Sequence, residues 1–288
     1  MDRTQRDGLL LLVAALGQVG GGAQSWLEFG PIRIQPSELA KPVLVLVLAR
    51  FYAMVPPREI RRWSAIWPAA ILVGVPTLII LVQPDLGTAT LIVFTTIVMM
   101  FLAGLPLRLF IGGALAAAAA GPIVYSFLLP HQQSRLLIFL DPEQDPLGAG
   151  YHLTQSKIAI GSGGLFGKGF LNGSQSHLQY LPEQHTDFIF SALAEEWGLA
   201  GALVLIALFM LLLRWGMKVA NAAKGRFERL AAAGLTATIF FYTAINLLMV
   251  MGLAPVVGIP LPLVSYGGSA MMTVMPSCSK IFSMRPVW

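Results

Sequence analysis

Long runs without a charged residue constrain this chain more than any other feature. Three uncharged runs of 22 residues occupy positions 63–84, 86–107 and 109–130, and a run of 50 covers 230–279. About 20 mostly apolar residues cross the hydrocarbon core of a bilayer as a helix. A soluble domain needs a polar shell, yet only 11% of the 288 residues are charged, where about a quarter is usual. The runs therefore predict an integral membrane protein with several spans.

The individual spans follow from these runs and from weaker ones. The longest run holds two helices, because the proline-rich stretch 255–262 is a natural break. The weakest candidates are 8–22, which is short and ends in three glycines, and 39–55, which contains two basic residues. The predicted fold is all-α, a polytopic integral membrane helix bundle that forms a single domain over residues 1–288. The predicted spans, about eight in number, cover 8–22, 39–55, 63–84, 86–107, 109–130, 188–213 and the two halves of 230–279.

Lysine and arginine residues divide unevenly between the two sets of loops that alternating spans create. One set carries 14 of the 19 basic residues, namely Arg3, Arg6, Arg50, Arg58, Arg61, Arg62, Arg108, Arg214, Lys218, Lys224, Arg226, Arg229, Lys280 and Arg285. The other set, with nearby span ends, carries Arg33, Lys41, Arg135, Lys157 and Lys168. Because loops rich in Lys and Arg stay in the cytoplasm, both termini are expected inside and the loop 131–187 outside. The net charge of +5 is thus a topology signal and no evidence of nucleic-acid binding.

The large extracytoplasmic loop 131–187 holds all four histidines of the chain. A loop of this length is usually functional or disordered. Its stretch Ile158–Phe170 mixes Ile, Leu and Phe with five glycines, so we expect the loop to fold back onto the outer membrane surface. The histidines lack zinc-site spacing, and the glycines lack the Gly-x-x-x-x-Gly-Lys-Ser/Thr order of a nucleotide phosphate loop. Neither a protein-built metal site nor nucleotide binding is expected.

Two aspartates at the outer ends of spans are candidates for chemistry. Asp187 lies where the large loop re-enters the membrane, and partial desolvation there favours a role as a general base. A helix cap explains the same position equally well. Asp85 lies in a short outer turn that begins Gln83-Pro84, and from the residues alone a cap is the favoured explanation. Glu195 lies eight residues after Asp187 and near the same helix face, so it points into the bundle or packs with a polar partner.

Four further residues near the outer side suit a phosphate-bearing or amphipathic ligand. Lys41 lies one turn inside its span, where it must pair, reach water or snorkel to the headgroups. Arg33 and Arg135 face outward, and a guanidinium fork matches phosphate oxygens, although ordinary headgroup contact is the alternative. Trp26 suits the interfacial belt of aromatic residues.

Seven sequence motifs occur in an order typical of one family. They are Gln35–Lys41, Gln83–Thr88, Phe139–Pro142, Asp145–His152, Gln155–Gly164, His185–Phe190 and Pro260–Ser269. With these motifs the chain closely resembles the SEDS family (shape, elongation, division, sporulation) from about Gly21 to Ser269. The resemblance implies a peptidoglycan glycosyltransferase that polymerises lipid II at the outer face of the bacterial cytoplasmic membrane, for cell elongation and rod shape.

The resemblance also implies roles for individual residues. Asp187 matches the family's essential outer-loop aspartate, and Lys41, Asp85, Arg33 and Trp26 match polar and aromatic positions around its outer cavity. Chemically, Lys41 and Arg33 suit a departing diphosphate, and a divalent cation (Mg²⁺ or Mn²⁺) held with Asp85 could share that role. No organic cofactor is expected. The expected partners are lipid II, a class B penicillin-binding protein and other elongation-complex proteins.

Both ends of the chain depart from the family pattern. The family has ten spans, and we expect that the first two are missing here. Pro276 and Lys280 interrupt the last apolar run, which predicts a final helix that is short, kinked or poorly ordered. A lipid II flippase and a non-catalytic scaffold are the alternatives to an enzyme. The polar span residues gather on the outer side, which favours an outer-face enzyme over a flippase.

Cysteine labelling of intact cells tests the orientation. Starting from a Cys278→Ser background, a Ser174→Cys variant should react with a membrane-impermeant maleimide, because its loop is expected outside. An Ala222→Cys variant should stay unlabelled, because the basic loop 214–229 is expected in the cytoplasm. The reverse labelling pattern would contradict this orientation and the outer-face enzyme with it.

Overall fold

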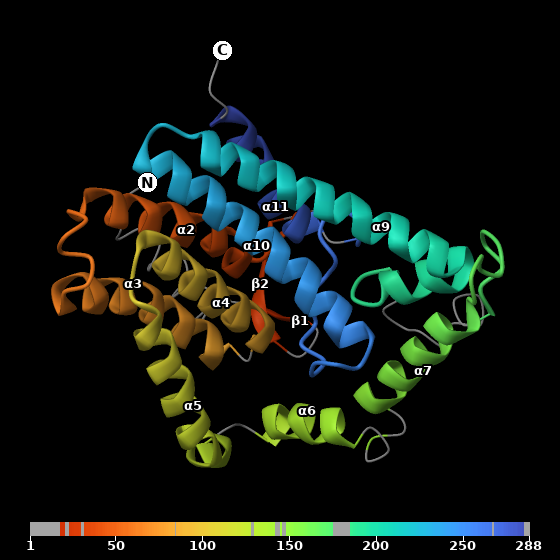
Figure 1. Ribbon diagram of the computed structural model, residues 1–288. Coiled ribbons are helices and arrows are strands. Elements are labelled where there is room, and N and C mark those ends of the chain that lie inside the picture. Colours follow the sequence, from red (N-terminus) through yellow and green to blue (C-terminus); the bar gives the residue numbers. More distant parts are fainter. Residues whose placement is uncertain are drawn as a thin grey trace. The chain divides into compact units, whose positions relative to one another are not determined.

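The fold is dominated by helices, which confirms the all-α prediction (Figure 1). The computed structural model describes residues 18–284 apart from 21–22, 30–31, 84, 128–129, 142–144, 146–147, 175–184 and 267. The helices are α2 (Pro36–Met54), α3 (Trp63–Val82), α4 (Leu86–Ala103), α5 (Leu107–Phe127), α6 (Pro130–Leu140), α7 (Ala149–Ser162), α9 (Ile189–Ala222), α10 (Arg226–Val250) and α11 (Gly268–Ser283).

Three short strands precede the helices. They are β1 (Gln18–Gly20), β2 (Ala23–Phe29) and β3 (Ile32–Ile34), and each pairs antiparallel with the next. The sequence analysis missed them, because segments of three to seven residues are too short to show a clear two-residue alternation. The predicted first span, 8–22, is wrong over residues 18–20, which form a strand. Its residues 8–17 and 21–22 lie outside the described part of the chain.

Four described helices are long and apolar enough to cross a membrane: α3, α4, α9 and α10. They match the predicted spans 63–84, 86–107, 188–213 and the first half of 230–279. The proline-rich stretch 255–262 is non-helical and separates α10 from α11, as predicted. Helix α7 and all but the first residue of α6 fall inside the predicted loop 131–187. The count of eight spans stays a prediction.

The described residues group into two compact units, and each is treated by itself. The first unit comprises the residues up to Phe127, with Arg214–Phe241 and the residues from Gly268 onward. The second unit comprises Leu128–Leu213 and Tyr242–Gly267. The single domain predicted over 1–288 stays a prediction.

In the first unit, α2, α3 and α4 pack against one another, and α11 packs against α2 (Figure 1). The buried side chains come mainly from α2, α4 and α10; they include Leu48, Tyr52, Leu91, Met99 and Leu235. At one end of this bundle, the guanidinium of Arg226 donates hydrogen bonds to the carbonyls of Val55 (2.8 Å) and Ala103 (3.4 Å). These carbonyls lie at the C-terminal ends of α2 and α4, where the helices lack internal donors, so one arginine caps two helices.

In the second unit, the core joins α7, α9 and the end of α10. Its buried apolar side chains include Ala159, Phe188, Phe190, Met249 and Leu261. Two buried hydroxyls bridge the helices as well: Ser156 Oγ lies 2.7 Å from Ser191 Oγ and donates to the carbonyl of Val250 at 2.7 Å. These hydrogen bonds offset the cost of burying the hydroxyls, and they link α7, α9 and α10.

The final helix confirms the expectation of a short helix. Helix α11 runs from Gly268 to Ser283 and continues through Pro276. The hydroxyl of Ser277 donates to the carbonyl of Thr273 at 2.7 Å and supplements the backbone ladder beside the proline. The helix is short, as predicted: 16 residues extend about 24 Å at 1.5 Å per residue, less than the hydrocarbon core of about 30 Å.

Gly234 provides a test of the packing in the first unit. A Cβ atom at this position would lie 2.2 Å from Met99 Sδ and 2.7 Å from Val45 Cγ1. Gly234→Val should therefore lower the free energy of unfolding by about 1–3 kcal/mol, the usual cost of overpacking a core. The measurement is the thermal unfolding midpoint of the purified protein in detergent.

Gly112 in α5 supplies the matched control. A Cβ there meets no atom of the described residues within 4 Å. Gly112→Val should therefore leave the unfolding midpoint nearly unchanged. Equal midpoints for the two variants would show that α10 does not approach α2 and α4 as closely as described.

Candidate active site

The predicted site residues fall into two groups, one in each unit. Trp26 in β2, Arg33 in β3, Lys41 in α2 and Asp85 before α4 belong to the first unit, and Asp187 before α9 belongs to the second. In the strand register, Gln18 is the partner of Trp26 and Glu28 is the partner of Arg33.

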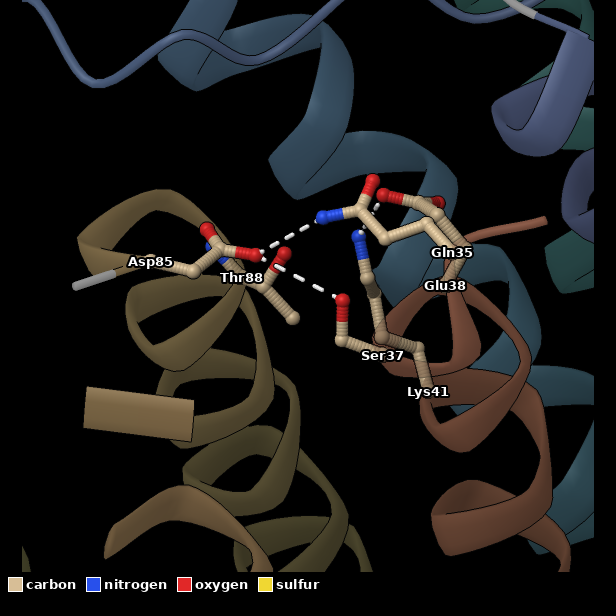
Figure 2. A network of polar contacts seen from close by, with 6 residues as sticks. All are labelled: Gln35, Ser37, Glu38, Lys41, Asp85 and Thr88. Atoms are coloured by element: carbon tan, nitrogen blue, oxygen red, sulfur yellow. Dashed lines mark hydrogen bonds and ion pairs between the residues drawn. The ribbon is translucent and has the colours of Figure 1, made fainter. Parts of the chain in front are cut away.

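Lys41 forms a buried ion pair with Glu38 (Figure 2). Lys41 Nζ lies 2.6 Å from Glu38 Oε1, and the two side chains are 3% and 7% exposed. Of the explanations open for Lys41, pairing is confirmed, and snorkelling to the headgroups is wrong because the side chain is enclosed. A buried charge is costly unless a partner neutralises it. Glu38 was not among the predicted site residues, although its spacing of three residues from Lys41 places both side chains on one helix face.

Asp85 links the start of α4 to the start of α2 (Figure 2). Its Oδ1 accepts a hydrogen bond from the backbone N–H of Thr88 at 3.0 Å, so the predicted cap is confirmed. Its Oδ2 accepts from Gln35 Nε2 at 3.1 Å and from Ser37 Oγ at 3.5 Å. The carboxylate therefore holds the Gln35–Lys41 and Gln83–Thr88 motifs together, and Gln35 and Ser37 are contacts that the sequence analysis did not single out.

A small cavity lies beneath Lys41 in the first unit. Its volume is about 10 Å³, and its lining includes Leu48, Leu91, Thr95 and Thr238. The buried hydroxyl of Thr95 has no hydrogen-bond partner among the described residues. A volume of this size admits about one water molecule and excludes a sugar.

Asp187 lies in the turn 185–188 directly before α9 and is half-buried. This agrees with the predicted partly desolvated position. The backbone N–H groups of Ser191 and Ala192 bond to the carbonyl of Phe188 at 3.0 and 3.3 Å, so Phe188 closes the first turn of α9. Asp187 is therefore one residue outside the position from which a side chain normally caps a helix. His152 and Phe188 lie nearby as a ring pair, with centroids 6.4 Å apart.

Glu195 is fully buried and forms an ion pair with Lys168. Lys168 Nζ lies 2.7 Å from Glu195 Oε1, and Ser174 Oγ donates to the same oxygen at 3.1 Å. The predicted polar partner of Glu195 is thus confirmed. The lysine that fills this role lies 27 residues earlier, beyond the reach of any helical spacing rule.

The glycine-rich segment 163–169 supplies hydrogen-bond partners for the main chain at a break in α9. The helix is interrupted at Gly198, whose φ of 66° and ψ of −164° are non-helical. The N–H groups of Lys168 and Gly169 donate to the carbonyls of Glu195 and Glu196, both at 3.0 Å. In return, the N–H groups on the far side of the break donate to the loop: Leu199 to Gly164 (2.9 Å) and Ala200 to Leu165 (3.1 Å).

Close backbone approach explains the glycines of this segment. A Cβ at Gly167 would lie 2.1 Å from the carbonyl oxygen of Glu196, so any side chain would push the loop off the helix. The glycines therefore serve loop–helix packing. Among the described residues there is also no group of three or more His, Cys, Asp or Glu that could hold a metal ion.

Comparison with known proteins identifies the family. Residues 8–284 match the family described as "Cell cycle protein", which is named after FtsW, RodA and SpoVE. The chain is 48% identical over 279 residues to "Peptidoglycan glycosyltransferase MrdB" of Escherichia coli K12, covering 96% of this chain and 75% of that protein. It is 34% identical to "Peptidoglycan glycosyltransferase RodA" of Treponema pallidum, covering 96% and 80%.

Solved structures agree with this assignment. The crystal structure of Thermus thermophilus RodA superposes with a TM-score of 0.68 at 31% identity, covering 96% of this chain and 74% of that one. A chain in the structure described as "Structural coordination of polymerization and crosslinking by a peptidoglycan synthase complex" reaches a TM-score of 0.82 at 33% identity, covering 99% and 83%. The chain therefore belongs to the FtsW/RodA/SpoVE family, the SEDS family of its motifs, and is a bacterial membrane protein.

The buried Lys41–Glu38 pair supports a double-mutant test of stability. Lys41→Met leaves a buried carboxylate without its ammonium partner, and breaking such a pair costs about 3–5 kcal/mol. Glu38→Gln combined with Lys41→Met removes both charges and should cost less than Lys41→Met alone. Thermal unfolding midpoints in detergent compare the variants. A larger loss in the double variant would mean that the pair is not the reason these charges tolerate burial.

Proposed function

We propose that the chain is a peptidoglycan glycosyltransferase that polymerises lipid II into glycan strands at the outer face of the bacterial cytoplasmic membrane, for cell elongation and rod shape. The names of its relatives, with 48% identity to MrdB across nearly the whole chain, support the reaction class. The observation that carries the mechanism is the half-buried carboxylate of Asp187, held in a turn directly before a helix of membrane-spanning length.

The reaction joins two lipid-linked sugars. The 4-hydroxyl oxygen of one sugar attacks the anomeric carbon of the other, whose bond to the lipid diphosphate breaks as the new glycosidic bond forms. The α-linked diphosphate gives way to a β-1,4 linkage, so a single displacement with inversion accounts for the stereochemistry. The hydroxyl must lose its proton to a base, and the leaving diphosphate must be stabilised by positive charge.

Asp187 is the proposed base. A carboxylate that is partly shielded from water is a stronger proton acceptor than an exposed one, and half-burial still leaves a side open to a substrate. Arg33 and Lys41 are the proposed diphosphate ligands, and Trp26 is a proposed contact for the lipid-linked sugar. Since Lys41 is already neutralised by Glu38, a diphosphate must compete with that carboxylate for the ammonium group.

A divalent cation, Mg²⁺ or Mn²⁺, fits the proposed reaction only as a companion of the substrate. Asp85 offers one carboxylate, whose oxygens already accept hydrogen bonds from Thr88, Gln35 and Ser37. Most of the ligands of such an ion would therefore be diphosphate oxygens and water, a common arrangement for Mg²⁺ at phosphate sites. The cation would neutralise charge on the leaving group, and no organic cofactor is proposed.

The proposed protein partner is a class B penicillin-binding protein, which crosslinks the glycan that the polymerase makes, within an elongation complex. Support comes from the similarity to a chain of a peptidoglycan synthase complex. The proposal places both termini in the cytoplasm and residues 131–187 outside, in line with the distribution of basic residues.

Asp187→Asn tests the proposed base. The substitution keeps the size of the side chain and removes its proton acceptor, so polymerisation should fall by about 10²-fold or more. The assay uses the purified chain reconstituted with its penicillin-binding protein and lipid II, and it follows glycan polymer. Glu196→Gln is the matched control, because Glu196 is another half-buried carboxylate of the same unit that carries no proposed role. It should polymerise normally.

Other outcomes of this assay separate the alternatives. Normal polymer from Asp187→Asn would remove Asp187 from the mechanism and leave Asp85 as the next candidate. Transfer of lipid II across the bilayer without polymer would indicate a flippase. If the unmodified chain binds its partner but yields no polymer and transfers no lipid II, the result would indicate a scaffold.

A further inference from the structure

Three consecutive carbonyl groups just before α9 each accept a hydrogen bond from the same distant part of the chain. The carbonyl of His185 accepts from the backbone N–H of Tyr266 at 2.8 Å. The carbonyl of Thr186 accepts from the hydroxyl of Ser265 at 2.5 Å. The carbonyl of Asp187 accepts from Asn246 Nδ2 at 2.8 Å. The donors come from the end of α10 and from the segment that follows it, 59 to 81 residues later in sequence.

Asn246 contributes two of the contacts that define this arrangement. Its Nδ2 also donates to the carbonyl of Ile259 at 2.7 Å, so one amide group joins the turn 185–188 to the segment 255–266. Both acceptors are carbonyl oxygens, and only the NH₂ side of the amide can donate to them, so the orientation of the side chain is fixed. Asn246 is fully buried, and therefore no water can replace either bond without entering the core.

Ser265 plays the corresponding role for the neighbouring residue. Its hydroxyl accepts from the backbone N–H of Leu261 at 2.7 Å while it donates to Thr186, so both functions of the oxygen are used. The side chain is 7% exposed. A buried hydroxyl with fixed donor and acceptor directions holds its partners to a narrow range of positions.

Gly258 brings the same segment to the carboxylate itself. Its φ is +68°, in the left-handed region that favours glycine, and a Cβ there would lie 3.4 Å from Asp187 Oδ2. The backbone at Gly258 therefore passes alongside the Asp187 side chain. The segment 255–266 thus contacts the turn at its main chain through hydrogen bonds and at its side chain through this close approach.

We propose that Asn246 and Ser265 are positioning residues, which hold the main chain of His185–Asp187 so that the Asp187 carboxylate points consistently at the hydroxyl it deprotonates. This inference rests on the proposed function of Asp187 as a base. A base works only within hydrogen-bond reach of its proton, and a displacement of about 1 Å can cost about 10²-fold in rate. A turn outside a helix lacks the regular main-chain hydrogen bonds of a helix. The donors Asn246, Ser265 and Tyr266 therefore fix the position of this turn.

Ser265→Ala is the principal test, with Asn246→Ala as the second variant. In the polymerisation assay, Ser265→Ala should lower kcat by about 10-fold, and Asn246→Ala, which loses two bonds, by about 10²-fold. KM for lipid II should stay within about twofold, because neither residue is proposed to touch the substrate. Ser265→Thr retains the hydroxyl and should restore most of kcat.

Hydrogen–deuterium exchange supplies a measurement that does not depend on activity. In Ser265→Ala and Asn246→Ala, the backbone amides of a peptide covering 185–192 should exchange about 5-fold faster or more, the factor expected for the loss of one buried hydrogen bond. Ser156→Ala is the matched control. It removes a buried hydroxyl of the same unit, bonded to Ser191 and Val250, and should leave kcat and the exchange of residues 185–188 unchanged.

The outcomes separate this inference from the proposed function. Unchanged exchange at 185–188 in both variants would overturn the inference, whatever the activity. Faster exchange with normal kcat would overturn the positioning role. An equal loss of kcat in Ser156→Ala would show that the variants act by destabilising the protein in general, and it would overturn the positioning role of Asn246 and Ser265. Normal polymer from Asp187→Asn would overturn the proposed base, while the exchange data still report whether Asn246 and Ser265 hold the turn.

Discussion

Main-chain hydrogen bonds that water cannot replace govern this structure. Inside a bilayer or a packed core, an unpaired N–H or C=O costs several kcal/mol, so each interruption of a helix needs a substitute partner. The break at Gly198 finds its partners in the segment 163–169. The ends of α2 and α4 find theirs in Arg226, and the turn before α9 finds them in Asn246, Ser265 and Tyr266. Each irregularity is thus held by a segment far away in sequence.

Buried charges follow the same rule. Lys41 is matched by Glu38, and Glu195 by Lys168, so no large uncompensated charge is left at these positions. The two pairs differ in exposure, because Lys168 is 30% exposed and Lys41 only 3%. The carboxylate of Asp85 is instead stabilised by three hydrogen-bond donors at the starts of α2 and α4. The polar residues of the family motifs therefore build the scaffold of the candidate site as well as contributing to its proposed chemistry.

The sequence predicted the parts of this structure that depend on local composition. Uncharged runs located α3, α4 and α10, and the motif order indicated the family. The sequence could not predict contacts between remote segments, since no periodicity links Lys168 to Glu195 or Ser265 to Thr186. Pro276 and Lys280 indicated a short final helix, and α11 has 16 residues and continues through the proline. The strands β1–β3 were not predicted, because three to seven residues are too few to show a clear two-residue alternation.

The segment 163–169, which pairs with α9 across the break at Gly198, has the position of a loop but a structural role in the helix. Residues 163–169 lie outside any helix, yet they complete the hydrogen bonds of a helix of membrane-spanning length. They supply hydrogen-bond partners on both sides of the break at Gly198, so the helix depends on this segment. An epitope tag or a deletion placed there, at what looks like a convenient surface position, would therefore act as a lesion in the span itself.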